Sequence, residues 1–232
     1  MQVIPVLDLL DGHAVRAVRG ERSRYRPIQS SLCATSDPVD VARALLAATG
    51  ASTLYVADLG AILGRGAHIE ALAALRHALG DGIAIWLDAG FSDFASMHAL
   101  FGRIVRFEPH AAAATLVPVF GTETLIEASA IADASAAGYE PILSLDYRGG
   151  RALGTLHGES AWWPSRVIVM TLDHVGANAG PDLQTFAAVR AMAGDRGLIG
   201  AGGVRHRDDV ARIARCGAQG WLVASAIHDR TV

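Results

Sequence analysis

Short apolar runs alternate with longer stretches of helical periodicity along the whole chain, and this alternation limits the fold more than any other feature. The runs are β-branched or aliphatic, whereas the stretches between them are rich in alanine and leucine. Such alternation is typical of strand–helix units that build a parallel sheet. We expect strands near residues 3–7, 53–57, 83–87, 115–119, 141–145, 166–170, 197–201 and 220–224. Eight such strands predict a closed (βα)8 TIM barrel in the α/β class, with an open, doubly wound sheet as the alternative.

The segments between the runs carry helix signals. Asp37 is a capping residue followed by a proline at the first helical position, and Gly50 ends the helix that begins there. Further helices are expected near residues 67–79, 92–101, 122–137, 182–193 and 206–216. Little sequence separates the fifth strand from the sixth or follows the eighth, so the fifth and eighth helices are predicted to be shortened. No linker divides the chain, which predicts a single domain, residues 1–232.

Composition and charge exclude several classes of function. Hydrophobic residues make up 51% of the chain and charged residues 19%, which predicts a large core and an apolar surface that could be covered in a homo-oligomer. A net charge of −3 gives no basic footprint for nucleic acid. There is no leader segment, no apolar run of membrane-spanning length and no paired spacing of the two cysteines. We therefore expect a cytoplasmic protein with no nucleic-acid or membrane partner.

Two aspartates, Asp8 and Asp146, end buried strands at equivalent places in the two halves of the chain, and a glycine turn follows each of them. If the halves are related and form one barrel, these carboxylates lie on opposite strands and face each other across one mouth. A single strand-end aspartate can simply cap the next turn, but an equivalent pair favours catalysis. Burial and mutual repulsion could raise one pKa, so that one carboxyl acts as an acid and the other as a base.

Small residues follow the seventh and eighth predicted strands, where barrels of this kind commonly bind phosphate. Gly202 and Gly203 follow the seventh strand, and Ala224 and Ser225 follow the eighth. Their backbone N–H groups, together with the positive end of a helix, could hold an anion. Glycines that only permit tight turns are the alternative, but two neighbouring small-residue turns favour a phosphate site. We therefore expect a small phosphorylated substrate.

The matching turns of the first half are a second candidate for anion binding. Gly90 follows the third strand, and Gly121 and Thr122 follow the fourth, so a duplication would make them a second phosphate site. However, Asp88 stands where the second anion would lie, and its carboxylate would repel a phosphate. The sequence leaves open whether this second site exists.

Other residues near the predicted mouth have two interpretations. Thr171, at the end of the sixth strand, could orient Asp146 or a substrate hydroxyl, or could be an ordinary strand threonine. The arginines between residues 16 and 26, Arg19 among them, form either a solvated loop or a loop that closes over an anionic substrate. Asp58 also ends a strand. The nine histidines show no metal-ligand spacing, so we assign no metal and expect no cofactor.

Together, these strand ends resemble those of the histidine-biosynthesis barrels. The similarity lies in VIPVLDLLDG at 3–12, SDPVDVA at 36–42, LYVADL at 54–59, SLDYRGG at 144–150 and GAGGV at 200–204. The isomerase branch, HisA, fits better than the cyclase branch, HisF, which has a lysine where Arg16 lies. HisA converts an aminoaldose phosphate into its aminoketose by an Amadori rearrangement. The resemblance implies that Asp8 is the base at C2, that Asp146 is the acid that opens the sugar ring, and that Thr171 is the family's strand-six threonine.

Several segments depart from the HisA pattern. Residues 88–90 replace three small residues, and residues 176–178 replace an Asp-Gly-Thr loop. These departures, with the Arg-Tyr-Arg-Pro segment at 24–27, resemble uncharacterised HisA/HisF-related proteins of methanogens and methylotrophs. The resemblance implies a HisA-like phosphosugar isomerase of histidine biosynthesis or a paralogous pathway. The alternatives are a related barrel with a different phosphorylated substrate and a non-catalytic barrel that binds a phosphometabolite.

Overall fold

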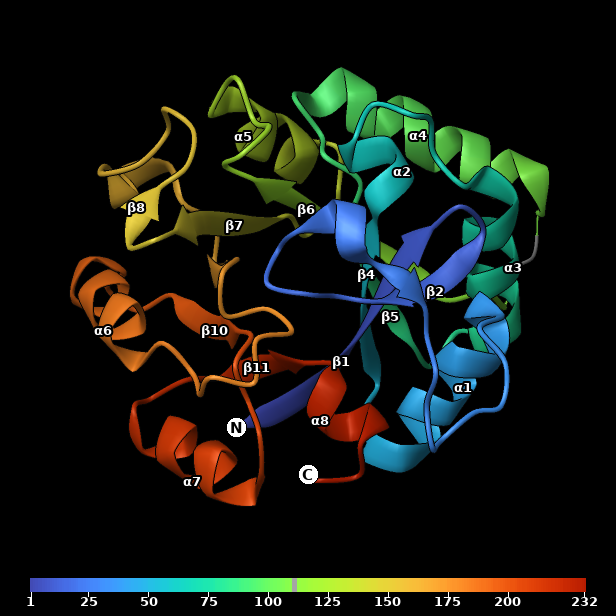
Figure 1. Cartoon of the computed structure of the whole chain (residues 1–232). Coiled ribbons are helices and arrows are strands. Elements are labelled where there is room, and N and C mark those ends of the chain that lie inside the picture. Colours follow the sequence, from blue (N-terminus) through green and yellow to red (C-terminus); the bar gives the residue numbers. More distant parts are fainter. Residues whose placement is uncertain (110–111) are drawn as a thin grey trace.

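The computed structural model, which describes residues 1–109 and 112–232, contains eight parallel strands closed into one barrel (Figure 1). Around the barrel these are β1 (Gln2–Leu10), β4 (Thr53–Asp58), β5 (Ala84–Asp88), β6 (Thr115–Gly121), β7 (Ile142–Arg148), β9 (Arg166–Thr171), β10 (Gly197–Ala201) and β11 (Gly220–Val223). The last strand returns to the first, with Gln2 opposite Gly220 and Pro5 opposite Val223. The predicted TIM barrel is therefore confirmed, and its closure excludes the open sheet.

Helices surround the barrel (Figure 1). They are α1 (Pro38–Thr49), α2 (Leu59–Ile62), α3 (Ile69–Leu79), α4 (Phe94–Phe107), α5 (Ser129–Ala136), α6 (Leu183–Met192), α7 (Arg207–Arg215) and α8 (Ser225–His228). As predicted, Asp37 caps α1 by accepting from the N–H groups of Val39 and Asp40, and Gly50 ends it in the left-handed conformation. No helix in the described ranges is long and apolar enough to cross a membrane.

Both predicted shortenings are confirmed. A single 3-10 turn, η2 (Ser160–Trp162), stands where the fifth helix of a regular barrel would lie, and α8 is one turn long. Two other helices differ from their expected bounds. Helix α4 continues to Phe107, and α5 begins at Ser129 instead of near residue 122. The late start of α5 has a local cause, since the N–H groups of Thr124 and Leu125 donate back to the Gly121 carbonyl and form a turn.

The barrel strands alternate between two apolar layers. Outward side chains such as Leu7 and Leu9 pack under the helices, whereas inward ones such as Ile4, Trp86 and Leu222 fill the barrel. Because successive side chains of a strand point to opposite faces, the inward positions of β1, β5 and β7 continue to an aspartate near the carboxyl end of each strand. Three carboxylates, from Asp8, Asp88 and Asp146, consequently enter the mouth of the barrel.

Strands β1 and β7 extend beyond the barrel in the same way. Each folds back as an antiparallel hairpin, β1 onto β2 (His13–Arg16) and β7 onto β8 (Arg151–Ala152). The connecting residues are Asp11-Gly12 and Gly149-Gly150, all four at positive φ, as tight hairpin turns require. The internal repeat seen in the sequence around the two aspartates thus includes the hairpins that follow them.

Candidate active site

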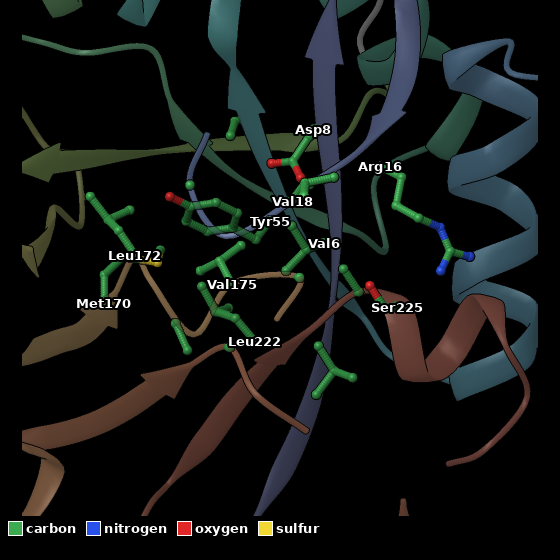
Figure 2. A pocket seen from close by; sticks show the side chains of 18 of the residues that line it. Val6, Asp8, Arg16, Val18, Tyr55, Met170, Leu172, Val175, Leu222 and Ser225 are labelled. Atoms are coloured by element: carbon green, nitrogen blue, oxygen red, sulfur yellow. The ribbon is translucent and has the colours of Figure 1, made fainter. Parts of the chain in front are cut away.

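A cavity of about 390 Å³ opens at the carboxyl ends of the barrel strands. Figure 2 shows Asp8 and Tyr55 reaching into it, with Leu222 and Val175 beside the tyrosine ring. Its polar groups include side chains from four of the barrel strands, from the loop between β1 and α1, and from the loops that follow the other strands. Its apolar wall is formed by Val6, Val18, Leu59, Ile62, Met170, Leu172, Val175 and Leu222. The cavity therefore combines an acidic floor with an apolar side, a surface that suits a small organic ligand.

Asp146 is almost fully buried and is held rigidly. Its Oδ1 accepts from the Ser144 hydroxyl at 2.8 Å, and its Oδ2 accepts from the Glu123 N–H at 3.0 Å. Its own N–H donates to Thr122 Oγ1 at 2.9 Å. The backbone of Gly121 leaves room for this arrangement, since a Cβ added there would lie 2.9 Å from Asp146 Oδ2.

Asp88 is oriented by the turn that follows β5 and by Tyr55. The Gly90 N–H donates to its Oδ1 at 3.0 Å, and the Tyr55 hydroxyl donates to its Oδ2 at 2.9 Å. Asp88 Oδ2 also lies 3.8 Å from the point where a Gly121 Cβ would stand. The carboxylates of Asp88 and Asp146 thus lie on either side of Gly121.

Asp8 differs from the other two carboxylates because no described residue donates a hydrogen bond to it. Its charged neighbours are Arg22, a cation, and Asp88, an anion. Arg22 comes from the short helix η1 (Arg22–Arg24) in the loop between β1 and α1, and its guanidinium bonds to Glu123 at 2.6 Å. This ion pair links the loop of the first strand to the loop that follows β6.

Burial and like charge shift the acidity of all three carboxyl groups in the same direction. Burial, with a smaller contribution from Asp88, raises the pKa of Asp8 to about 7, against the opposing effect of Arg22. Burial and Asp88 also raise the pKa of Asp146 to about 7, although its hydrogen bonds from Glu123 and Ser144 oppose the change. Burial raises the pKa of Asp88 as well. At neutral pH, the cavity can therefore both give and accept a proton.

The other end of the cavity offers hydrogen-bond donors. Gly202 and Gly203 have φ values of 80° and 82° and, with Ala224 and Ser225, line the cavity where β10 and β11 end. No described residue supplies an acceptor for the N–H groups of Gly203, Val204, Ser225 and Ala226. These donors lie at the position where the sequence predicted a phosphate.

The turns of the first half are different. Gly90 and Gly121 line the cavity as expected for the second candidate site, but Asp88 accepts from the Gly90 N–H and Asp146 from the Glu123 N–H. The Thr122 N–H donates to the Ser144 carbonyl at 2.9 Å. Each of these backbone donors is thus already engaged by the protein.

Four predicted residues, Thr122, Thr171, Arg19 and Asp58, lie outside the cavity lining, and the Thr122 hydroxyl holds the Asp146 N–H instead. The buried hydroxyl of Thr171 donates to the Ala201 carbonyl at 3.4 Å, and Thr171 shares the outward parity of Val167 and Val169. Arg19 lies in the first loop with a φ of 50°. Of the arginines between residues 16 and 26, Arg16 and Arg22 line the cavity. The buried Asp58 caps α2 and bonds to His68, as a structural residue would. Within the described residues, no group of acidic, histidine or cysteine side chains could hold a metal ion.

The chain is similar in sequence to known proteins over nearly its whole length. A family model described as "Histidine biosynthesis protein" matches residues 2–232. The chain belongs to this family. Among its relatives, a 1-(5-phosphoribosyl)-5-((5-phosphoribosylamino)methylideneamino)imidazole-4-carboxamide isomerase of Herpetosiphon aurantiacus is 28% identical over 238 residues, covering 98% of this chain and 93% of that protein. An uncharacterized protein of Methanocaldococcus jannaschii is 26% identical over 231 residues, covering 98% and 93%. The phosphoribosyl isomerase A of Streptomyces griseus subsp. griseus is 28% identical over 243 residues, covering 98% and 92%.

The sequence reasoning missed Tyr55 and Glu123, which shape the site of this family member, and included Arg22 only as one of the arginines of the first loop. Tyr55 has a signal in the sequence, because it lies two positions before Ala57 in the same strand and therefore points inward with it. Arg22 and Glu123 have no such signal. They meet only because loops far apart in the sequence converge over the mouth.

Thr122 provides a direct test of how Asp146 is held in this family member. In Thr122→Val, the buried N–H of Asp146 loses its acceptor at constant side-chain shape. We expect the free energy of unfolding to fall by about 1–3 kcal/mol, measured by urea denaturation. Thr122→Ser keeps the hydroxyl and serves as the control. A valine variant as stable as the wild type would show that this bond contributes little.

Proposed function

We propose that the protein is a HisA-like isomerase that converts a phosphorylated aminoaldose into its aminoketose by an Amadori rearrangement. The observation that carries the proposal is the pair formed by Asp8 and Asp146. They project into one cavity from opposite strands, and the pKa of each is raised to about 7. The names of the isomerase relatives support the reaction class.

The two aspartates take complementary roles in this proposal. Asp146 donates a proton to the ring oxygen as the C1–O bond breaks, which leaves an iminium at C1. Asp8 then removes the proton from C2 and gives an enolamine. Return of a proton to C1 and loss of one from the 2-hydroxyl yield the aminoketose and restore both carboxyls. General acid–base steps of this kind work best when the pKa of each group lies near the operating pH.

The free N–H groups beside Gly203 and Ser225 support phosphate binding at the other end of the cavity. Backbone donors without a protein acceptor are suited to the oxygens of a phosphate. The apolar wall beside them, with Leu222 and Val175, would cover the sugar and limit access of water to the iminium. In this proposal Thr171 does not contact the substrate. Its hydroxyl donates to the Ala201 carbonyl and so supports the end of β10.

The second candidate function is isomerisation of a related phosphorylated substrate in a different pathway. Asp88 favours it, since this carboxylate occupies the Gly90 N–H, which would otherwise be available for a second phosphate. A non-catalytic barrel that binds a phosphometabolite is the remaining alternative, and no feature of the cavity favours it over acid–base chemistry.

Complementation of a histidine auxotroph that lacks the isomerase, paired with direct assay of the purified protein on the aminoaldose, tests the proposal. Growth and turnover together would establish the histidine-pathway reaction. Soluble protein with neither growth nor turnover would exclude that reaction and leave the related substrate.

Arg22 should set the acidic limb of the pH profile in this mechanism. Its positive charge lowers the pKa of Asp8, so Arg22→Met is expected to raise that pKa further. The base would then need a higher pH to ionise, and the acidic limb of kcat/KM should move to higher pH. Arg22→Lys, which keeps the charge, is the control. A limb that stays in place or moves to lower pH would contradict the assignment of Asp8 as the base.

A further inference from the structure

We propose that the substrate carries one phosphate, and that its opposite end is a positively charged nitrogen group received by Asp88 and Tyr55. This inference rests on the proposed function and defines the substrate class of the same cavity. It assigns a binding role to two residues that the acid–base mechanism does not use.

The first argument is the unequal use of backbone donors at the two ends. Among the described residues, the N–H groups of Gly203 and Ser225 have no protein acceptor. At the other end, Asp88 and Asp146 take the N–H groups of Gly90 and Glu123, and the Thr122 N–H is engaged by a carbonyl. The N–H groups of Gly90, Thr122 and Glu123 are therefore not free for a phosphate, whereas those of Gly203 and Ser225 are.

The second argument is charge and space near Gly121. The Oδ2 atoms of Asp88 and Asp146 lie 3.8 Å and 2.9 Å from the position of a Gly121 Cβ. Like charges at such a separation near a protein surface repel each other strongly. A second phosphate at this turn would meet the Asp88 carboxylate and the Asp146 side chain at close range, whereas a cation would be attracted by Asp88.

The third argument is that each arginine lining the cavity, including Arg22 beside Asp8 and Asp88, is already paired with another carboxylate of the protein. Arg22 is the basic residue nearest to Asp8, and its guanidinium is engaged by Glu123 at 2.6 Å. Of the other arginines that line the cavity, Arg16 pairs with Asp229 and Arg205 with Asp209. No described residue donates to the Asp8 carboxylate. The acidic end is therefore left for a cation from the ligand.

An ammonium or amidinium group matches the geometry of this end. Asp88 accepts one hydrogen bond at each oxygen, from Gly90 and Tyr55, and each oxygen has a further lone pair. Tyr55 fixes the carboxylate while its ring forms part of the cavity side (Figure 2). The apolar residues between the two ends would contact the uncharged body of the ligand.

A matched set of linear alkyl phosphates tests the inference by isothermal titration calorimetry. The three compounds have equal length and end in an ammonium, a methyl or a second phosphate. We expect the ammonium compound to bind at least about tenfold more tightly than the methyl compound, and the bisphosphate to bind most weakly. Equal or tighter binding of the bisphosphate would overturn the inference, as would failure of all three compounds to bind.

Two variants test whether Asp88 causes the preference for the ammonium compound over the methyl compound. Asp88→Asn keeps the shape of the side chain and removes its charge, so the ammonium and methyl compounds should bind with similar affinity. Asp195→Asn makes the same change of net charge at an exposed residue before β10, at the opposite end of the barrel, and should keep the preference. A preference that survives in Asp88→Asn would reject Asp88 as the receptor. If Asp88→Asn fails to fold, the ligand series on the wild type still decides.

The binding series and the isomerase assay can fail separately. Tight binding of the ammonium compound with no turnover of any aminoaldose would reject the proposed function and keep the ligand class. Efficient turnover of a doubly phosphorylated aminoaldose would keep the function and reject the ligand class.

Discussion

Asp8→Asn and Asp146→Asn are each expected to lower kcat/KM at pH 7 by about 10²–10⁴-fold, the usual contribution of a positioned acid or base. Each change keeps the size of the side chain and removes its ability to exchange a proton. The double variant should lose little more than the worse single variant, because the two groups act in one proton-transfer sequence. The measurement is steady-state kinetics on the substrate that the wild type turns over.

The control for this prediction is Asp195→Asn, which changes the net charge equally but lies far from the mouth. It should retain the wild-type rate, and all variants should show the circular dichroism of the folded protein. Wild-type kinetics in either active-site variant would remove that residue from the mechanism. Retained binding of a phosphate ligand by the inactive variants would show that only chemistry was lost.

Asp8→Asn is also expected to make the protein more stable at pH 8, by about 2–4 kcal/mol in the free energy of unfolding. The pKa of Asp8 is about 7 in the folded state and near the ordinary aspartate value of 3.8 in the unfolded state. The folded protein therefore binds the proton more strongly, and stability falls as the pH rises from about 4 to 7. Above pH 7 the full cost of the buried charge is present, and asparagine removes it.

Urea denaturation at pH 8 and below pH 4 checks this sign. The two proteins should differ most at pH 8 and converge below pH 4, where Asp8 is protonated in both states. Because Asp8 has no hydrogen-bond donor among the described residues, asparagine loses no partner there. A variant that is less stable than the wild type at pH 8 would mean that the carboxylate is compensated by interactions with its surroundings. A gain in stability together with a loss of turnover is the compromise expected of an active site.

Local signals account for the parts of the fold that the sequence predicted. The eight barrel strands form where the short apolar runs lie in the sequence. Asp37 and Gly50 define the start and the end of α1 through contacts within that helix alone. The predicted start of α5 was wrong. The N–H groups of residues 124 and 125 donate to the Gly121 carbonyl and form a turn that helical periodicity does not reveal. The hairpins after Asp8 and Asp146 were missed because each strand continues beyond the residue that faces the cavity.

Local signals likewise predict some features of the candidate site and not others. The presence of Asp8, Asp88 and Asp146 in one cavity follows from strand position alone, because carboxyl ends of barrel strands converge. Predicting the side to which each side chain points also requires the inward and outward alternation of residues within the strand. That parity sends Thr171 and Asp58 away from the cavity and brings Tyr55 into it. The pairing of Arg22 with Glu123 depends on loop conformation, which no local pattern specifies.

The pairing of β11 with β1 has a consequence for synthesis of the protein. Residues 2–5 leave the ribosome long before their partners at residues 220–223 are made. Until then one edge of β1 stays open and the ends of β10 and β11 do not yet complete the cavity. Long-range strand pairing of this kind is slow to form and leaves an edge that can bind other chains. Function is consequently acquired in one step, when the last strand docks, and a nascent chain lacking that strand is exposed to aggregation.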